Sequence, residues 1–417
     1  MAQTAGLLSL LAEFGMQRFH VEYRVYRSNH LLHALVALHG LGARDGRLEE
    51  IAKHMATDYP LEPARASEGD LQGDEWKLLL GKKKRFVDLR KFFTAKVDSL
   101  GAGSAIAEYY TPLLDGGVAC AALHPLIHLG YGLLANSSQD VADGLAYVVW
   151  AHRAAGHNDG IVSTEARDKI VLTVASADSP LPSWAGAVAN APKPTHEFLA
   201  HPLCSILLGM RRDIRLQRTI PALVELVDEN LEKLTPLTGY GKYSLRLFHI
   251  QDSILDIVEG HLDDSGVLGS VTGDESLEQV LSTLMQGILL AYASTANSDD
   301  FFILHGLTSV FALQQVLPCL PSFAARLEAV RVFCRDLLSV YILQDMPSLV
   351  PWSIDHADLP SWLEIRTHTV KSNDEHLIKV VFTCQRMEQQ FGKELLGAEV
   401  YRAVAAYKSG LRQWPRS

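Results

Sequence analysis

The chain has few cysteines, little positive charge and no long uninterrupted apolar run, and each shortage excludes a class of protein. Its five cysteines contain no CxxC pair and lie in apolar contexts, which predicts reduced, buried thiols in a cytoplasmic protein. The formal net charge of −10 argues against nucleic acid or an anionic membrane as a partner. No apolar run approaches the roughly 18–20 residues of a membrane span, and the N-terminus lacks the basic start of a signal peptide. We therefore expect a soluble protein that binds neither nucleic acid nor membrane.

Recognisable nucleotide-binding and hydrolase motifs are also missing. The stretch GAGSAI after Leu100 lacks the third glycine of a dinucleotide loop. GYGKYS at Gly239 lacks the four-residue spacer of a P-loop, and no GxSxG elbow occurs. The sequence therefore predicts no nicotinamide or flavin loop of known type. NADPH would have to act through an external reductant or an unrecognised site.

Apolar residues recur with the helical period along most of the chain, whereas alternating strand patterns are nearly absent. The run LLHALVALHG predicts a helix that ends at Gly40, and Thr219 followed by Pro221 predicts the start of another. We expect an all-α fold, a large irregular multi-helix domain over residues 1–417 with a ligand or metal cavity between helices. A stretch rich in Pro, Ala and Ser at 176–198 predicts an exposed crossover within it.

The chain contains 17 histidines, and several of them occur in pairs inside apolar helical segments. His124 and His128 in HPLIHLGYG lie four residues apart, so both rings project from one helix face and can reach one metal ion. His30 and His33 in SNHLLHAL repeat the arrangement at a spacing of three. A lone buried histidine is usually a hydrogen-bonded core residue, but pairs in separate segments favour a shared site.

Two further segments supply groups of the same kind. His305 stands in the apolar stretch FFILHGLTSVFAL, where a buried polar ring must find a partner. His376 and Lys379 in NDEHLIKVV lie three apart, just after Asp374 and Glu375 at a predicted helix start. An inward lysine beside histidines is costly unless it is neutralised, paired or chemically modified. The alternative is a lysine whose stem lies on the core while its amine reaches water.

Four of these stretches resemble, in order and spacing, the questin oxidase-like proteins of fungal polyketide clusters and bacteria. They are SNHLLHALVALHGLGA, HPLIHLGYGL, HGLTS…ALQQVLP and DEHLIKVV, and the resemblance extends from about residue 15 to residue 390. It implies action on anthraquinones or related polyketides, with ring opening by oxygen insertion or C–C cleavage. Family members are described as NADPH-dependent Baeyer–Villiger-type oxidases or as non-haem iron oxygenases.

In the iron description, the ligands are mostly histidines, together with a lysine that is carboxylated on its amine. Carried over position by position, the resemblance implies these metal ligands: His30 (or His33), His124, His128, His305, His376 and the modified Lys379. The sequence departs from the fungal members at Ala34, where they often have another histidine, and it lacks long loop insertions. These differences mean that the family's substrate does not carry over directly.

Tyrosines near these motifs offer further donors. Besides Lys379 and His376, we expect Tyr131 to take part in catalysis as a donor beside the metal. Tyr292 is a second tyrosine of this kind, and ordinary packing is the alternative reading of both.

Imidazoles with an oxygen donor suit Fe(II) better than calcium or magnesium, with zinc as the open alternative. We therefore expect an oxygenase in which Fe(II) and O2 act on an aromatic or quinone substrate in an apolar cavity. Two alternatives stay open: a non-catalytic helical protein that binds a metal or small molecule, and a two-zinc hydrolase. The oligomeric state cannot be read from the sequence.

Overall fold

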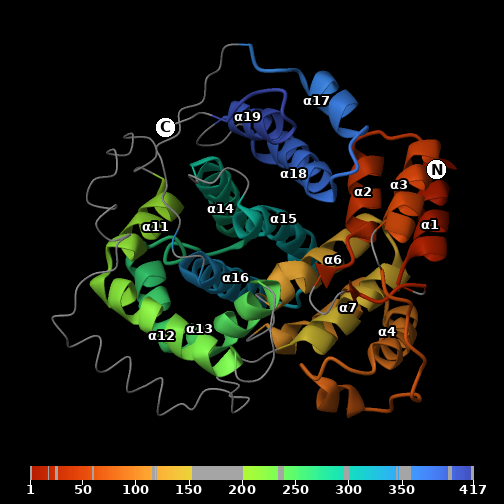
Figure 1. Cartoon of the computed structure of the whole chain (residues 1–417), viewed down its shortest axis with the longest axis horizontal. Helices are drawn as coiled ribbons and strands as arrows, with labels where there is room; N and C mark the ends of the chain where they lie inside the picture. The colour runs from red at the N-terminus through yellow and green to blue at the C-terminus, as the bar shows by residue number, and fades with distance from the viewer. Residues whose placement is uncertain are drawn as a thin grey trace. The chain divides into compact units, whose positions relative to one another are not determined.

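The computed structural model describes residues 2–16, 18–23, 27–58, 61–114, 118, 120–152, 201–232, 239–294, 300–343, 346, 358–392 and 397–414. This part is helical apart from one short hairpin, so the predicted all-α fold is confirmed (Figure 1). Contacts divide the chain into two compact units: Met1–His152, Leu304–Ala329 and Ile354–Trp414 form the first, and Arg153–Ile303, Val330–Ser353 and Pro415–Ser417 form the second. The single domain expected from the sequence stays a prediction, and the crossover at 176–198 lies outside the described residues.

The first unit combines helices from both ends of the chain. Its α-helices are α1 (Ala2–Phe14), α2 (Leu31–Gly40), α3 (Asp45–Asp58), α4 (Phe86–Leu100), α5 (Ala102–Tyr109), α6 (His124–Leu134), α7 (Ser138–Ala151), α17 (Trp362–Thr369), α18 (Glu375–Phe391) and α19 (Glu399–Lys408). Short 3-10 helices are η1 (Glu75–Leu79), η2 (Thr111–Leu113), η3 (Cys120–Leu123) and η4 (Leu317–Cys319). Strands β1 (Glu22–Tyr23) and β2 (Arg27–Ser28) pair antiparallel. Helix α2 packs on α3, α6 and α18, and α7 packs on α4 and α6.

The second unit is built around α11 (Pro202–Arg212), which packs on α12 (Ile214–Glu232), α13 (Gly239–Asp264) and α14 (Asp274–Ser294). Helix α15 (Phe301–Val316) begins in this unit and continues into the first, while α16 (Phe323–Leu343) begins in the first and ends in this one.

The predicted helix start at Thr219 and Pro221 was wrong, because α12 begins at Ile214 and contains Pro221 in its interior. The side chain of Asp213 accepts a hydrogen bond from the backbone N–H of Arg215 at 2.9 Å, which satisfies a donor in the first turn. The apolar period also extends upstream of the proline to fully buried side chains. Capping and burial together place the start of the helix earlier than the proline indicated.

One stretch, Phe301–Cys319, is long and apolar enough to cross a membrane, which corrects the expectation that no run approaches that length. It covers α15 and η4, with a mean hydropathy of 1.4 over the best window. Inside the structure, 72% of that window is buried, and core helices of soluble proteins meet the same criteria.

All five cysteines are free thiols, as the sequence predicts. Four of them are buried, but Cys319 at the end of η4 is partly exposed. The expectation that every thiol is buried was therefore wrong at that one position.

Two glycines let α6 approach its neighbours closely. A Cβ on Gly130 would lie 2.6 Å from the Cα of Ala312 in α15, and one on Gly144 in α7 would lie 2.8 Å from the Cα of Leu129. Closely packed interiors do not accept such contacts, so a larger residue would push the helices apart. Helix α6 is thus held against α7 and α15 at a spacing that glycine permits.

Gly130→Ala is expected to lower the free energy of unfolding by about 1–3 kcal/mol, because the added methyl group overpacks the contact with α15. Gly46→Ala in α3 is the matched control, since a Cβ there would meet nothing within 4 Å. Alanine also favours helix over glycine, so the control should be unchanged or more stable by up to about 1 kcal/mol. Urea denaturation measures both variants, and equal stabilities would contradict the close approach of α6 and α15.

Candidate metal centre

Six histidines and one lysine that the sequence singled out come together in the first unit. This histidine cluster consists of His30 and His33 at the start of α2, His124 and His128 on α6, His305 on α15, and His376 and Lys379 on α18. Neighbouring ring centroids lie between 4.5 and 5.6 Å apart. All members except His376 are buried, and 21% of the His376 side chain is exposed.

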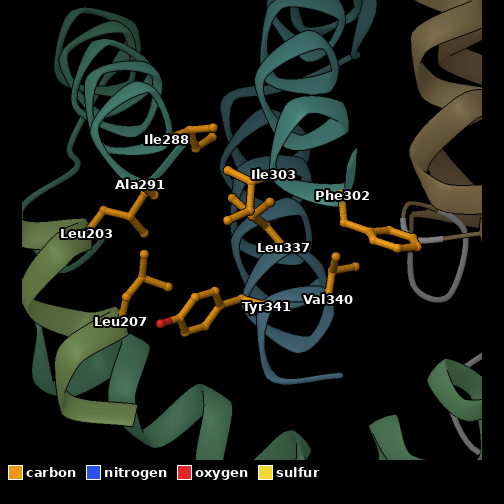
Figure 2. Close-up of a pocket in the computed structure, with 9 residues that line it drawn as sticks. All are labelled: Leu203, Leu207, Ile288, Ala291, Phe302, Ile303, Leu337, Val340 and Tyr341. Atoms are coloured by element: carbon orange, nitrogen blue, oxygen red, sulfur yellow. The ribbon is translucent and has the colours of Figure 1, made fainter. Parts of the chain in front are cut away.

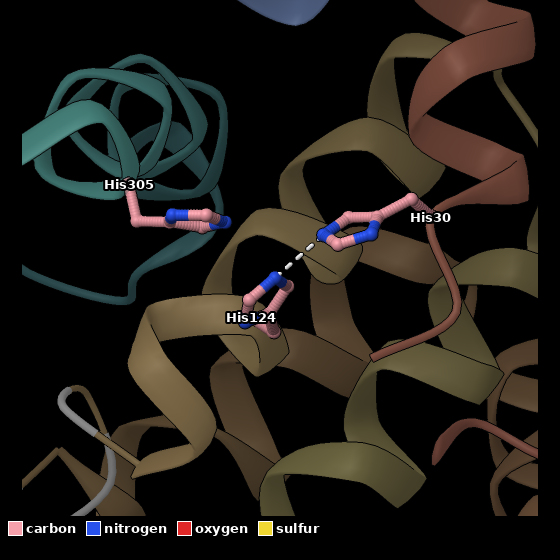
Figure 3. A group of neighbouring side chains, drawn as sticks. All are labelled: His30, His124 and His305. Carbon is pink, nitrogen blue, oxygen red and sulfur yellow. Dashed lines mark hydrogen bonds between the residues drawn. The ribbon is translucent and has the colours of Figure 1, made fainter. Parts of the chain in front are cut away.

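Three rings from separate segments converge at the centre of the cluster. The ligand nitrogens that His30, His124 and His305 offer all lie within 4.8 Å of one another (Figure 3). The ring of His124 lies 4.5 Å from that of His305 and 4.8 Å from that of His30, measured between centroids. We call these three residues the inner group. Three imidazoles in this arrangement could hold one transition-metal ion.

Hydrogen bonds fix where the protons lie in the inner group. His124 Nδ1 lies 2.5 Å from the carbonyl oxygen of Ala121, and a carbonyl only accepts, so this nitrogen carries a proton. A neutral His124 then has its lone pair on Nε2, and the proton in the 2.7 Å contact between the two Nε2 atoms belongs to His30. A metal ion bound by both nitrogens would displace that proton.

The distance between those nitrogens fits a metal ion with little movement. Two nitrogens that lie about 2.1 Å from one ion at a right angle are about 3 Å apart. The rings of His30 and His124, with Nε2 atoms 2.7 Å apart, would separate by only a few tenths of an ångström. The pair of His30 and His124 therefore fits a metal in both donor type and spacing.

A second group of three shares His30 with the inner group and adds Glu375, which the sequence reasoning did not select. The donor atoms of His30, Glu375 and His376 lie within 4.8 Å of one another. Glu375 Oε1 lies 3.7 Å from His30 Nδ1 and 3.6 Å from His376 Nδ1. Adjacent residues of a helix project about 100° apart, so the spacing of Glu375 and His376 gave no signal. The position of Glu375 directly before a candidate ligand, at a helix start, was the available signal.

His33 and His128 form a layer behind the inner group. Their ring centroids lie 5.4 Å apart, and neither ring has a hydrogen-bond partner on either nitrogen within the described part of the chain. Neither belongs to the two groups of three, so their role as ligands stays a prediction. Of the alternatives His30 and His33, the two groups of three include only His30, and which of them binds the metal stays a prediction. Burying the four ring nitrogens of His33 and His128 without hydrogen bonds costs free energy, which favours a bound group close to them.

The two tyrosines lie outside the inner group. The buried ring of Tyr131 packs 5.1 Å from that of His33 and 6.2 Å from those of Phe311 and Phe382, so it stands behind the inner group. Tyr292 is buried in α14 of the second unit. A catalytic role for Tyr131 stays a prediction.

Burial keeps five of the six histidines neutral at physiological pH. It lowers the pKa of His124 and of His128 to about 3, with the positive charges of Lys379 and Arg90, respectively, acting in the same direction. Burial also lowers the pKa of His30, His33 and His376 well below the usual value, again with a contribution from Lys379. A neutral imidazole has a lone pair to give to a metal, so the cluster is ready to bind without first losing charge.

Lys379 is fully buried, and its amine has no hydrogen-bond partner within the described residues. Burial lowers its pKa to about 7, and the charge of Lys408 acts in the same direction, whereas Glu375 and Asp374 oppose the change. The amine is therefore neutral in a large fraction of molecules at neutral pH. This fully buried amine differs from the alternative of a lysine whose amine reaches water.

The chain enters α6 through a strained turn that aims His124. Ala121, Ala122 and Leu123 have φ values of 46°, 53° and 68°, in the left-handed region that favours glycine. Each such residue costs about 1–3 kcal/mol. The turn brings the carbonyl of Ala121 onto His124 Nδ1 and so sets the direction in which the other ring nitrogen points.

The start of α18 is fixed from α3 by Arg47. Its guanidinium donates three hydrogen bonds of 2.6–2.7 Å to the turn at residues 370–373. Asp374 then caps the helix, and its Oδ1 accepts from the backbone N–H groups of His376 and Leu377. This double attachment holds the first turn of α18, which carries the acidic and imidazole groups of the site.

Acid is expected to destabilise the metal-free protein in a window set by these histidines. In the unfolded chain each is protonated near its ordinary pKa of 6.5, whereas folded His124 and His128 resist protonation until about 3. The stability they contribute is fully present above pH 6.5 and is lost as the pH falls toward 3. Each histidine should remove about 1.4 kcal/mol per pH unit. Urea midpoints of chelated protein at several pH values measure this loss.

His128→Phe is the matched variant for that measurement, because phenylalanine fills similar space without titrating. Its stability should depend less steeply on pH than that of the wild type. Identical pH profiles for the two proteins would contradict the assignment of this ring as a buried neutral histidine.

Comparison with known sequences places this site in a family. The sequence model of the family described as Questin oxidase-like matches residues 27–384, which include every member of the histidine cluster. A Baeyer–Villiger oxidase, AgnL3 of Paecilomyces divaricatus, is 31% identical over 140 residues, which cover 31% of this chain and 29% of the relative. The match thus spans less than a third of that relative's length. Because the family match covers most of the chain, the protein belongs to the questin oxidase-like family.

Proposed function

We propose that the protein is an Fe(II)-dependent oxygenase that inserts oxygen into, or cleaves, an aromatic or quinone ring of a polyketide-like substrate. Family membership and the similarity to a Baeyer–Villiger oxidase support an oxidoreductase that acts on polyketides. The observation that supports a metal site is the convergence of buried, neutral imidazoles with a buried lysine in one cluster. Such a donor set suits iron or zinc better than magnesium or calcium.

The inner group would hold the metal through imidazole nitrogens. His30, His124 and His305 provide three imidazole donors, and Glu375 lies close enough to His30 to add a carboxylate oxygen or to orient that ring. When bound, Fe(II) would supply the activation of O2. The burial of the inner group would keep bulk water away from the metal.

Lys379 would contribute an oxygen donor after modification by CO2. Its neutral amine nitrogen attacks the carbon of CO2, a C–N bond forms, and one N–H proton leaves to solvent, which yields an anionic carbamate. The fully buried position and a pKa of about 7 favour this reaction, since the protonated amine has no lone pair to attack with. The product carries negative charge next to neutral imidazoles, whereas an ammonium there would repel a cation.

The electron balance separates the two reactions open to such an enzyme. Insertion of one oxygen atom and reduction of the other to water needs two electrons from an external donor such as NADPH. Insertion of both atoms during C–C cleavage needs none. Incorporation of label from 18O2 into the product, with and without NADPH, distinguishes the two with a hydroxyanthraquinone as the probe substrate.

Metal analysis of protein purified without chelators tests the proposal most directly. We expect one iron per chain after anaerobic reconstitution, together with O2 consumption that depends on the anthraquinone. Two zinc ions per chain with hydrolytic activity would identify a hydrolase instead. Absence of bound metal after reconstitution, with ligand binding intact, would identify a non-catalytic binding protein. Either of these outcomes would overturn the oxygenase.

A further inference from the structure

A buried chain of hydrogen bonds lies beside the histidine cluster, where the β1–β2 hairpin meets α7. The hydroxyl of Tyr147 donates to Glu22 Oε1 at 3.1 Å, and its oxygen lies 2.7 Å from Ser28 Oγ. Because the Tyr147 proton points at Glu22, the Ser28 hydroxyl is the donor in the second bond. Lys83 Nζ donates to the other carboxylate oxygen of Glu22 at 2.8 Å. Tyr147, Glu22 and Ser28 are buried, whereas 33% of the Lys83 side chain is exposed.

Tyr147 is the member of this chain that lies next to the histidine cluster. Its ring centroid lies 6.5 Å from that of His128, with the two rings nearly perpendicular, and the ring of His33 follows 5.4 Å beyond His128. A phenol gives up an electron far more readily when its proton leaves at the same time, because the neutral radical avoids a buried positive charge. Tyr147 can therefore act as an electron donor to the cluster if a base stands at its hydroxyl.

The Glu22 carboxylate is placed to be that base. Burial raises the pKa of Glu22, but the Lys83 ammonium opposes this change and favours the anionic form, which can accept a proton. Burial also raises the pKa of the Tyr147 hydroxyl well above its ordinary value, so the phenol keeps its proton until the electron leaves. Once Glu22 is neutralised, the remaining positive charge is on Lys83, whose side chain reaches solvent.

We propose that Tyr147 is a redox-active tyrosine that gives one electron to the histidine cluster while its proton moves to Glu22. The O–H bond of Tyr147 breaks and an O–H bond forms on Glu22 Oε1, which leaves a neutral tyrosyl radical and a neutral carboxylic acid. The electron reduces a strong one-electron oxidant that is generated at the cluster when O2 reacts without substrate. This protective role rests on the proposed oxygenase, whereas the redox property of Tyr147 does not.

Two other buried tyrosines lack such a base. Tyr131 packs 5.1 Å from His33, but within the described part of the chain no carboxylate is hydrogen-bonded to its hydroxyl. Tyr341 belongs to the second unit, where its ring lies among the apolar side chains of a small pocket (Figure 2). Its hydroxyl is hydrogen-bonded to Arg211, and a guanidinium cannot take up a proton. Tyr341→Phe is therefore the matched control for Tyr147→Phe.

Photochemical oxidation of the full-length, chelated protein tests the redox property without any metal. A flash on ruthenium tris(bipyridine) with persulfate generates the oxidant, and EPR of frozen samples detects tyrosyl radicals. We expect a long-lived radical in the wild type and in Tyr341→Phe, and its loss in Tyr147→Phe. The long-lived radical should also be lost in Glu22→Gln, because the neutral amide has the shape of the carboxylate but is not a base. Circular dichroism checks that each variant is folded.

Three outcomes would overturn the proposal. The wild type could form no long-lived radical, which needs no variant to establish. The radical could survive in Tyr147→Phe, which would place it on another residue. It could also persist unchanged in Glu22→Gln, which would exclude Glu22 as the proton acceptor.

The protective role is measured separately on the iron-loaded enzyme. Exposure to O2 without substrate should inactivate Tyr147→Phe faster than the wild type or Tyr341→Phe. Equal rates of inactivation would refute the protective role and leave the oxygenase itself untouched. Failure of the oxygenase would appear in the metal analysis and would not change the radical in the metal-free protein.

Discussion

Replacing Lys379 with alanine is expected to abolish oxidation, with kcat/KM lower by at least about 100-fold, because the site loses its anionic oxygen donor. Lys379→Glu should restore part of the activity, since it offers a carboxylate on a shorter stem. Removal of dissolved CO2 during metal reconstitution should lower wild-type activity, and bicarbonate should restore it. A carbamate signal in 13C NMR after labelling with 13C-bicarbonate measures the modification itself, and it should be absent from Lys379→Ala.

Two controls separate chemistry from folding in this experiment. Lys379→Met keeps the length of the stem without the amine, and it should be inactive yet at least as stable as the wild type, since no buried amine remains to be desolvated. Lys371→Ala removes an exposed lysine shortly before α18 and should change nothing. Wild-type rates in Lys379→Ala, or full activity without any carbamate signal, would refute the role of Lys379.

His124→Ala is expected to remove most of the bound metal while the helical circular dichroism signal stays largely intact. His124 contacts His30 directly, and its other nitrogen is fixed by Ala121, so its loss removes one donor and frees another. Loss of one ligand should weaken metal affinity by at least about 10–100-fold. Metal content by mass spectrometry after dialysis measures the effect. His368→Ala, an exposed histidine of α17, is the control and should retain full metal.

The same measurement on His128→Ala decides the role of the deeper ring. The i, i+4 spacing predicts that His124 and His128 share the ion, whereas the structure places His128 with His33 behind the inner group. Full metal occupancy in His128→Ala would remove it from the ligand set. Full occupancy in both variants would refute the metal site on α6.

The helices and the convergence of the histidines could be predicted from the sequence, whereas the details of the site could not. Burial of an apolar face depends on local periodicity, so the helix that holds His124 and His128 was readable from HPLIHLGYG alone. The part played by Glu375 was not, because its contacts reach His30 across more than 300 residues. The strained turn at Ala121 was also hidden, since nothing in the letters CAAL demands left-handed backbone. The prediction from Pro221 was wrong because capping by Asp213, upstream of the proline, outweighed the preference of proline for a helix start.

At the beginning of α2, the neighbouring residues Asn29 and His30 have different roles. His30 occupies the N-cap position, where a side chain usually closes the first turn, but its ring makes no such bond. Asn29 does so instead, with its Oδ1 accepting the N–H of Leu31 at 3.0 Å. The imidazole of His30 is therefore not needed to cap its own helix, and it can face the rings on other segments. An Asn29 variant would remove this cap from the first turn of α2 and so change how the His30 ring is held, without deleting any metal donor.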